Sequence, residues 1–449
     1  MSDLLRLLTL EDYNTRVVAL GCALLGAACG GIGTFTLLRG RALVADVVAH
    51  ASLPGVCAAF LIFGTRSLPV LLLGALTFGI LGMLCVTWIR RATPVKEDAA
   101  LAITLSVFFG IGICLLMVVQ QDQRGTQSGV DSFIFGKAAA MIRSDVILAA
   151  SMCAAAFIVL AAMWNPLKLV CFDRNFGDAI GQRMGLVDFI LMALVCLCTT
   201  AALPAVGLVM VVALLTIPPA AARFWTDRLT TMVIVSSIAG AVAGVLGAGV
   251  SALHSEFSTG PVIVLICAAI FGVSMLFAPR RGVLFAALRR TQLRTRIADQ
   301  NLLRSMYELS ETNQVDAKNP RAAEPAAETT FDALLMRRAW TQSELEHLIR
   351  RAISRSEVER SNDRYRLTQK GRTQAAAIVR AHRLWELFLI DQASIAPDHV
   401  DRDADSIEHV LPEDVIAKLE QQLRETGKLP TEFTVPKSPH EIPKHAARP

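Results

Sequence analysis

The sequence predicts an all-α polytopic membrane protein with about nine transmembrane helices, followed by a smaller soluble part. Two observations carry this prediction. Of the 449 residues, 53% are hydrophobic and only 18% are charged, which lies outside the range of an ordinary soluble protein. The hydrophobic excess lies before Arg280, in runs near the length that crosses about 30 Å of hydrocarbon. Later residues are charged and periodic. The chain therefore divides into two parts.

The predicted transmembrane helices follow one another with mostly short connections. Their ranges are Val17–Leu38, Ala42–Phe63, Leu68–Trp88, Ala99–Val119, Asp145–Trp164, Val187–Leu203, Gly207–Ala222, Met232–Leu253 and Pro261–Phe277. Only "PAV" separates the sixth range from the seventh, so these two could also form one long broken helix. Residues 1–16 lack the basic start and the cleavage site of a secretory signal, and we expect an amphipathic lead-in helix there.

Basic residues mark alternate loops between these helices. They are Arg39, Arg41, Arg90, Arg91, Lys96, Lys168, Arg174, Arg183, Arg223, Arg228, Arg280 and Arg281. Because Lys and Arg in short loops stay on the cytoplasmic side of a membrane, all of these loops can be cytoplasmic together. We therefore expect the N-terminus outside and the C-terminal part in the cytoplasm.

The second predicted helix carries an acid and an imidazole inside an apolar run. Asp46 and His50 are four residues apart and share one helix face. Ionisable groups in a spanning helix are costly and mark a pathway or a site by default, and this donor pair suits a first-row divalent cation. Pro54 and Gly55 follow at once and predict a helix break that offers backbone carbonyls. Alternatively, Asp46 caps the helix and His50 bonds to a neighbouring helix.

A second candidate pair lies in the predicted outer loop before the last transmembrane helix. His254 and Glu256 could receive a cation at an entrance, or they could be ordinary solvated loop residues. The ten cysteines lie mostly in apolar runs without metal-ligand or disulfide spacing, so we expect small buried side chains.

The stretch "GRALVADVVAHASLPGVCAAFLI" resembles the signature of the manganese/zinc/iron permease family of ABC importers. Further segments follow in the family's order, from "KEDAALAITLSVFFGIGICLL" to "FSTGPVIVLICAAIFGVSMLF", so the resemblance covers about Leu20 to Phe277. It implies that Asp46 and His50 line the path of a transported divalent metal ion (Mn, Zn or Fe) in a bacterial cytoplasmic (inner) membrane. The implied partners are an ABC ATPase subunit, an extracytoplasmic metal-binding protein, a second permease subunit and membrane lipid.

The same resemblance identifies "FDRNFGDAIGQRMG" as a cytoplasmic coupling segment that docks on the ATPase. The residues implied are Phe172, Asp173, Gly177, Ala179 and Gly181. The chain has no phosphate-binding loop of its own, since "GK" at residues 136–137 has neither the glycine spacing nor the following Ser or Thr. The chain is therefore expected to be a transport subunit and not an enzyme, with ATP hydrolysed by a partner.

Beyond the permease domain (residues 1–280), the pattern predicts three further regions. Residues 281–330 contain a basic connector, a first helix and a flexible insertion rich in Ala and Pro. Residues 331–372 contain two short helical patterns and a hairpin with Asn-Asp at its tip, which predict a winged helix-turn-helix of α+β type. Residues 373–443 contain two helical elements, about Arg372 to Ile390 and Asp403 to Thr426.

Candidate metal ligands recur in the last region. His382 and Glu386 are spaced i, i+4, and Asp405, Glu408 and His409 are spaced i, i+3, i+4. Such groups on two helices could hold a divalent ion, although each alone could equally be a solvated helix face or an ion pair.

Segments of this region, such as "YRLTQKGRTQAAAIVRAHRLWELFLID" and "DADSIEHVLPEDVIAKLE", resemble the iron- and manganese-dependent repressors of the diphtheria toxin repressor type. The resemblance implies a helical metal-binding and dimerisation region in which His382, Asp405, Glu408 and His409 bind a regulatory metal. Glu386 is a further candidate. The carboxylate of Asp405, at a position that is Cys in iron-type members, favours Mn(II).

Two residues depart from that repressor pattern. Asn301 stands where the first helix normally supplies Met or Asp, and Asp401 stands where iron-type members have His. The second short helix offers polar side chains to a DNA groove, but Glu344 and Glu346 would repel phosphates.

Together these observations predict a permease subunit for a divalent transition metal, with Mn(II) favoured over Zn(II) and Fe(II), fused to a metal-sensing domain. One alternative is a bifunctional permease and metal-dependent DNA-binding repressor, either tethered to the membrane or released by proteolysis. Another alternative is a C-terminal module that only helps permeases to dimerise.

Overall fold

The computed structural model describes residues 13–65, 67–121, 133, 136, 138–253, 258–316, 328–338, 340–392 and 413–425. The chain forms two compact units, Met1–Ala286 and Ala287–Pro449. The boundary between the two units falls inside one long helix, α14 (Val283–Asp316). The basic connector and the first helix predicted after Arg280 are therefore parts of the same helix.

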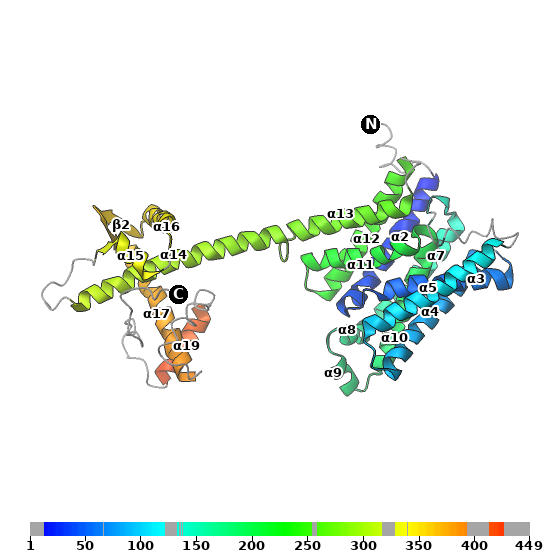
Figure 1. The fold of residues 1–449 in the computed structure, drawn as a ribbon, viewed down its shortest axis with the longest axis horizontal. Helices are drawn as coiled ribbons and strands as arrows, with labels where there is room; N and C mark the ends of the chain where they lie inside the picture. Colours follow the sequence, from blue (N-terminus) through cyan, green and yellow to red (C-terminus); the bar gives the residue numbers. More distant parts are fainter. Residues whose placement is uncertain are drawn as a thin grey trace. The chain divides into compact units, whose positions relative to one another are not determined.

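Helices dominate the described part of the first unit (Figure 1). They are α2 (Tyr13–Leu38), α3 (Val44–Phe63), α4 (Leu68–Ala92), α5 (Glu97–Gln121), η2 (Ala138–Ala140), α7 (Arg143–Ala162), α8 (Trp164–Phe172), α9 (Arg174–Ala179), α10 (Met184–Val206), α11 (Leu208–Trp225), α12 (Leu229–Leu253) and α13 (Thr259–Phe277). Eight helices among the described residues are long and apolar enough to cross a membrane, and α11 contains a shorter apolar stretch. Eight of the nine predicted ranges overlap these eight helices, and the seventh, Gly207–Ala222, overlaps α11.

The sixth and seventh predicted ranges form two helices, α10 and α11, that meet at Gly207. Gly207 has a φ of +91°, which only glycine adopts without strain. Pro204 lies inside α10 just before this point. The chain therefore turns at the glycine, and the alternative of one long broken helix is wrong.

Helix α2 is the central helix of the first unit and packs against α7, α10, α11 and α12 (Figure 1). Its contact with α12 depends on small residues. A Cβ atom added to Gly26 would lie 2.2 Å from the carbonyl oxygen of Gly240, and Ser236 Oγ donates a hydrogen bond of 2.6 Å to the Gly30 carbonyl. Small residues allow helices to approach closely in a membrane, where no water drives them together.

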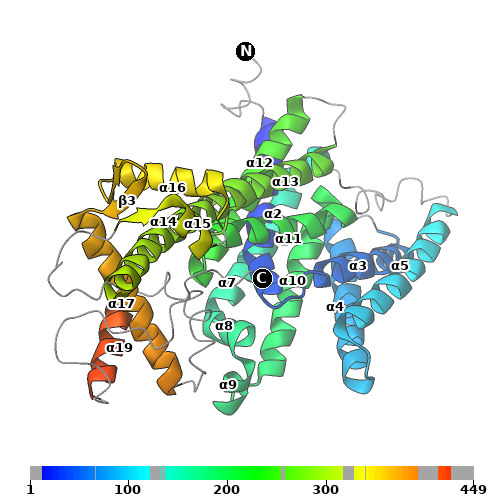
Figure 2. The same ribbon diagram turned by 60° about the vertical axis from the view of Figure 1, so that its left-hand side comes forward.

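Helices α3, α4 and α5 pack on one another as a second group (Figure 2). The outer helices of the unit leave large apolar side chains exposed, including Ile103 of α5, Ile158 of α7 and Leu265 of α13. A soluble protein would bury such residues, so these faces fit an apolar solvent.

The second unit combines helices with a small sheet. After α14 come β1 (Thr329–Thr330), α15 (Phe331–Arg337), α16 (Gln342–Ser354), β2 (Val358–Ser361), β3 (Arg364–Leu367), α17 (Gln369–Gln392) and α19 (Glu413–Glu425). The sheet is antiparallel in the order β1-β3-β2. The hairpin predicted around Asn362-Asp363 is confirmed, because Ser361 pairs with Arg364 and Asn362 has a φ of +56°.

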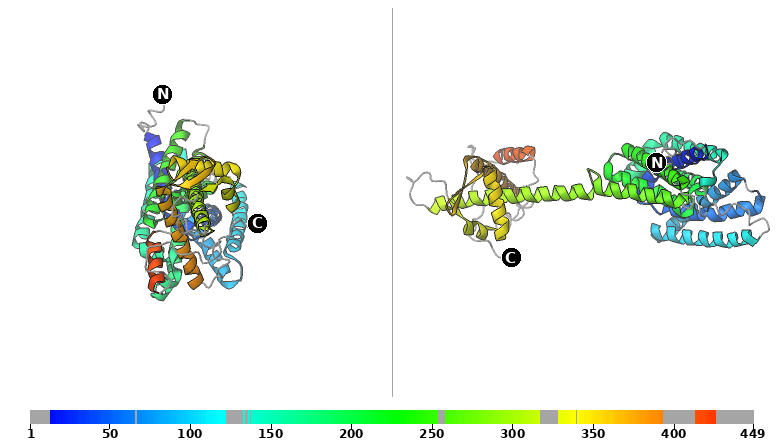
Figure 3. Two further views of the ribbon diagram at one scale, coloured as in Figure 1. Left: turned by 90° about the vertical axis from the view of Figure 1, so that its left-hand side faces the viewer. Right: turned by 90° about the horizontal axis from the view of Figure 1, so that it is seen from above.

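One core joins the helices and the sheet of the second unit. It contains Leu302, Leu303 and Met306 of α14, Leu334 of α15, Leu345, Leu348 and Ile349 of α16, Val358 of β2, Tyr365 of β3 and Ala375 of α17. The N-terminus of α16 is capped by Thr341, whose hydroxyl and backbone N–H both contact Glu344 in a capping box. Helix α17 packs against α19 (orange and red in Figure 3).

Candidate functional site

The first candidate site is the Asp46–His50 pair on α3. Val44 begins the helix, so Asp46 lies in its first turn, where a carboxylate is favoured by the helix dipole. His50 lies one turn further on, and its Nε2 is 3.3 Å from Asp46 Oδ1. The side chains are 31% exposed for Asp46 and 16% exposed for His50. The pair is therefore sheltered by the protein but still accessible to a small ion.

Packing also holds the imidazole of His50, in addition to its contact with Asp46. Its ring meets the ring of Phe109 of α5 edge-on, with centroids 4.8 Å apart. The Nδ1 atom of His50 is buried and has no hydrogen-bond partner within the described part of the chain. No lysine or arginine among the described residues forms an ion pair with Asp46. Among the described residues, the pair therefore has no lysine or arginine paired with it, and one nitrogen of the imidazole has no hydrogen-bond partner.

The predicted helix break at Pro54 and Gly55 is wrong. Helix α3 continues through both residues to Phe63. Proline has no N–H, so the carbonyl of His50, four residues earlier, lacks its helical donor all the same. Gly55 serves packing, because a Cβ atom there would lie 2.1 Å from the carbonyl oxygen of Gly74 on α4. The proline therefore frees an oxygen beside the candidate pair without interrupting the helix.

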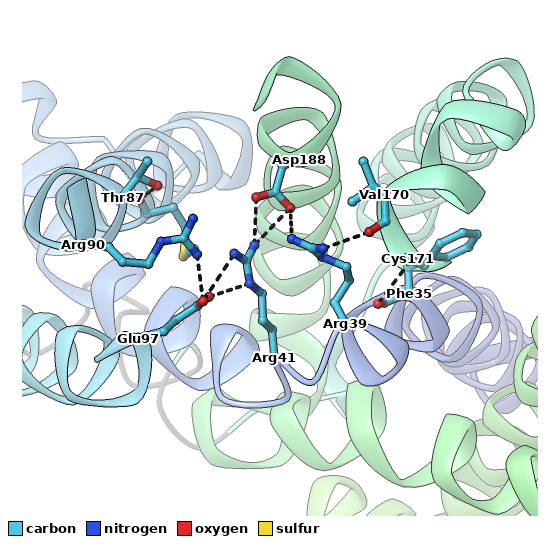
Figure 4. Close-up of polar contacts among 10 residues, drawn as sticks. Phe35, Arg39, Arg41, Thr87, Arg90, Glu97, Val170, Cys171 and Asp188 are labelled. Carbon is cyan, nitrogen blue, oxygen red and sulfur yellow. Dashed lines mark hydrogen bonds and ion pairs between the residues drawn. The ribbon is translucent and has the colours of Figure 1, made fainter. Parts of the chain in front are cut away.

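Just before α3, a chain of ion pairs joins four elements of the first unit (Figure 4). Arg39 and Arg41 both bind Asp188 of α10, at 3.1 and 2.9 Å. Arg41 also pairs with Glu97 of α5, and Glu97 binds Arg90 of α4 at 2.7 Å. We call these five residues the ion-pair ladder. Its existence places three of the predicted basic loops at one end of the helix bundle.

The ladder also reaches α8. Arg39 donates a hydrogen bond of 2.8 Å to the carbonyl oxygen of Val170 (Figure 4), two residues before the predicted coupling residue Phe172. Asp188 is 14% exposed, so this carboxylate is largely removed from water. The ladder was not predicted from the sequence. The signal for it is Asp188, an acidic residue at the start of the apolar range Val187–Leu203.

The predicted coupling residues lie on α8, α9 and the turn after them. Phe172 ends α8, Asp173 caps α9 by accepting a hydrogen bond of 2.9 Å from the Phe176 N–H, and Ala179 ends α9. Gly177 is buried, and Gly181 has a φ of +81° in the following turn.

Three large apolar side chains stand out from this segment. Phe172, Phe176 and Ile180 are 61%, 54% and 52% exposed. Phe176 and Ile180 were not singled out from the sequence, although their i, i+4 spacing places them on one helix face. An exposed aromatic and aliphatic face outside the long apolar helices fits a protein partner.

The second candidate site is the His382–Glu386 pair on α17. Both side chains are buried, with 1% and 0% exposure, and His382 Nε2 is 3.0 Å from Glu386 Oε1. The guanidinium of Arg304 of α14 lies 3.1 Å from His382 Nδ1. Arg304 also binds Glu308 at 2.7 Å, and Glu308 binds Arg337 at 2.8 Å.

Glu308 is ionised in this setting. Burial alone would raise the pKa of Glu308, but the ion pairs with Arg304 and Arg337 outweigh it and hold that pKa below its usual range. The pair on α17 is therefore linked to a neutralised network of buried ions, and its imidazole already has a cationic neighbour.

The remaining predicted ligands lie outside the described residues. These are His254, Glu256, Asp405, Glu408 and His409. Among the residues that the structure describes, no group of three or more His, Cys, Asp or Glu side chains could hold a metal ion. One further donor on α14 is notable, since Asn301 Oδ1 is buried and has no hydrogen-bond partner there.

Comparison with known proteins decides the family. The sequence pattern of the ABC 3 transport family matches residues 11–278, which is more than half of the chain. The chain belongs to this family. A second pattern, the iron dependent repressor metal binding and dimerisation domain, matches residues 368–433. This ABC 3 permease therefore carries a repressor-like segment in its second unit.

Two curated relatives are permeases for different metals. The manganese transport system membrane protein MntC of Bacillus subtilis (strain 168) is 35% identical over 428 residues, which cover 94% of both chains. The zinc transport system membrane protein TroC of Treponema pallidum (strain Nichols) is 39% identical over 293 residues, 65% of this chain and 98% of that protein. The similarity to MntC thus extends into the second unit.

One solved structure matches the permease part. It is PsaBC from Streptococcus pneumoniae in complex with Fab, with a TM-score of 0.54 and 29% identity over 60% of this chain and 94% of that chain. The ABC 3 permease described here is a multi-pass membrane protein and a transport subunit, as its family and its apolar helices indicate.

Proposed function

We propose that this ABC 3 permease imports Mn(II), with Zn(II) and Fe(II) as alternatives, and that Asp46 and His50 are ligands of the passing ion. The observation that carries the proposal is a carboxylate and an imidazole 3.3 Å apart in an apolar helix, with no described cation beside them. Carboxylate favours Mn(II), whereas imidazole accepts Mn, Fe or Zn. The relatives named for manganese and for zinc support both readings.

Each feature around the pair lowers the cost of moving a dication through the bilayer. The charge of Asp46 replaces part of the hydration energy that the ion loses. Pro54 leaves the His50 carbonyl without a helical hydrogen bond, so this oxygen is available as a third metal ligand in the same turn. Two or three ligands from one subunit bind weakly enough to release the ion. A second permease subunit related by twofold symmetry would complete the site.

The exposed apolar side chains and the basic loops suggest how the other partners bind. The face formed by Phe172, Phe176 and Ile180 would dock on an ABC ATPase, and the exposed apolar helices would contact lipid. An extracytoplasmic metal-binding protein would deliver the ion at the opposite end of the bundle. This orientation keeps the basic loops and the second unit in the cytoplasm of a bacterial cell.

The ion-pair ladder supports a route from the ATPase to the metal ligands. Arg39 contacts α8 at Val170 and Asp188 at the start of α10, so it flanks the coupling segment on both sides. Arg41 shares Asp188 and lies five residues before Asp46. A movement of α8 and α9 would therefore pull on the start of α3 through paired charges.

The ladder is tested by one matched pair of variants. Asp188→Asn should lower metal uptake by about tenfold at normal membrane levels, while ATP hydrolysis continues, because the helices lose their ionic link. Asp227→Asn is the control, since Asp227 also pairs with two arginines, Arg280 and Arg281, but is 50% exposed. Equal effects of both variants would remove the ladder from the mechanism.

The second unit would act as the regulatory part. Its repressor-like segment at residues 368–433 supports this role, and we assign the regulatory metal ion to Asp405, Glu408 and His409. Rising cytoplasmic Mn(II) would then reduce import. In the triple variant Asp405→Ala/Glu408→Ala/His409→Ala, uptake should stay constant while cellular Mn(II) rises. Normal inhibition in that variant would remove the regulatory reading.

Transcriptional repression by this chain has less support. Glu344 and Glu346 lie on α16, the helix that would enter a DNA groove, and neither is buried. Both would repel the phosphate backbone. Metal-dependent binding of the full chain to its own promoter would reverse this preference.

The permease proposal is tested by metal-resolved uptake in cells that also express the ATPase and the binding protein. Asp46→Ala and His50→Ala should each abolish uptake of the transported metal ion, while the amount of permease in the membrane stays normal. Asp98→Ala is the matched control, because it removes an exposed carboxylate from the start of α5. Unchanged uptake in the α3 variants would reduce the pair to structural residues.

A further inference from the structure

We infer that Arg304 is a built-in cation that occupies the His382–Glu386 pair, so that this pair binds no regulatory metal ion. The inference concerns the second unit alone and stands whether or not the permease transports metal. It separates two groups of residues that the sequence pattern had joined. One group contains His382 and Glu386, and the other contains Asp405, Glu408 and His409.

The hydrogen-bond directions at His382 carry the first step. A guanidinium has only donors, so Arg304 donates to His382 Nδ1, and Nδ1 must present its lone pair to that contact. The ring proton then lies on Nε2 and is donated to Glu386 Oε1, 3.0 Å away. Neither ring nitrogen has a lone pair left for a metal. A His ligand needs one, so the described arrangement does not fit a bound ion.

Charge balance carries the second step. Among the described residues, hydrogen bonds and ion pairs join two guanidinium groups, those of Arg304 and Arg337, to two carboxylates, those of Glu308 and Glu386, with His382 between Arg304 and Glu386. The charges of these four described groups balance. A divalent cation bound at His382 would place two further positive charges next to Arg304 in a buried region, because Arg304, His382 and Glu386 are all less than 4% exposed.

Position in the chain carries the third step. Arg304 lies on α14 among the core residues Leu303 and Met306, so its side chain is delivered to α17 by a rigid helix. A tethered group acts at a high effective concentration, which an ion at low concentration does not match. Arg304 thereby fixes α17 to α14 permanently, a task that a metal ion would perform only when present.

The experiment is a Co(II) titration of the full chain in detergent, followed by absorption spectroscopy, in an Asp46→Ala/His50→Ala background that removes the transport ligands. His382→Gln in this background should leave the number of bound Co(II) ions and their spectrum unchanged. Loss of a bound ion on His382→Gln would overturn the inference. Arg350→Gln, which changes an exposed arginine of the same unit, is the control for nonspecific effects.

A second experiment tests whether removing Arg304 creates a new metal site. Arg304→Met removes the cation and should create a Co(II) site that binds at least about tenfold more tightly than the parent chain, and Arg304→Met/His382→Gln should lose it. A folded Arg304→Met chain without the new site would contradict the inference. If Arg304→Met fails to fold, the His382→Gln titration alone still decides between a metal site and an arginine-filled pair.

Discussion

Two carboxylate–histidine pairs with the same i, i+4 spacing have opposite surroundings in this protein. Asp46 and His50 are partly exposed, are positioned by Phe109, and have no described cation beside them. His382 and Glu386 are fully buried and are positioned by Arg304. The first pair has no described arginine or lysine beside it, so its carboxylate is available to a bound cation. The second pair already has a cation beside it, the guanidinium of Arg304.

The difference teaches that spacing alone does not define a metal site. Both pairs satisfy the same sequence pattern, because helix geometry brings residues four apart together whatever surrounds them. The deciding residue lies far away in the chain, at position 304 for the second pair. Whether a candidate set of ligands can bind a metal ion therefore depends on whether a lysine or arginine already lies beside it.

Removing the cation from the second pair should have the largest effect on stability. Arg304→Leu leaves His382 and Glu386 without their charged neighbour and weakens the fixation of Glu308, so the second unit should lose about 3–5 kcal/mol of unfolding free energy. Denaturant unfolding of the full chain, monitored by a probe in the second unit, measures this. Arg350→Leu is the control, because its pair with Glu346 spans 3.7 Å on the surface and should be worth less than about 1 kcal/mol.

Disturbing the packing behind the first pair should have the next largest effect. In Gly55→Ala the new methyl group meets the Gly74 carbonyl and forces α3 away from α4, at a cost of about 1–3 kcal/mol. Metal uptake should fall with it, since α3 carries Asp46 and His50. Gly110→Ala on α5 meets nothing within 4 Å and should be neutral or slightly stabilising. Equal thermal shifts for both variants would show that the α3–α4 contact is loose.

Loosening the imidazole itself should have a smaller effect. Phe109→Leu keeps an apolar side chain but removes the edge-on ring contact with His50, which is worth about 0.5–1.5 kcal/mol. We expect up to about a tenfold rise in the Mn(II) concentration for half-maximal uptake, because the ring is less well oriented. Ile103→Leu, also on α5 and exposed, is the control. An altered maximal rate with unchanged half-saturation would point to a role outside the ion's path.

Lowering the pH should reduce the stability of the second unit gradually, with a smaller effect than the substitutions above. Because the folded pKa of Glu308 lies below its unfolded value, the stability from this group is fully present above the unfolded pKa of about 4.3 and is lost as pH falls through the folded pKa. Thermal unfolding at pH 6, 4.5 and 3 should show this loss, and Glu308→Gln should flatten it. A pH dependence that is identical in the variant would assign acid sensitivity to other carboxylates.

Much of the fold could be predicted from the sequence. Continuous apolar runs predicted the transmembrane helices to within a few residues, and Asn362-Asp363 at the tip predicted the hairpin. The continuous path of α3 could not be predicted, because Pro54 breaks helices in water but is tolerated where neighbours enclose the backbone. The single long helix α14 was missed because its basic residues resemble a connector.

The candidate sites were predicted less completely than the fold. Asp46 and His50 stood out because charge is rare in an apolar helix. Arg304 and the ladder did not, since Asp188 and Arg39 are 149 positions apart and only tertiary structure brings them together. The roles given to Asp46, His50 and the coupling residues remain predictions for the experiments above.

The exposed face of Phe172, Phe176 and Ile180 has a consequence for protein quality control. A permease made in excess of its ATPase would present these side chains to chaperones and proteases, which recognise exposed apolar surface. Cells would then degrade unpaired copies and keep only those that have found a partner. The ratio of the two subunits could in this way be set after translation, by the same three side chains that we propose as the ATPase contact.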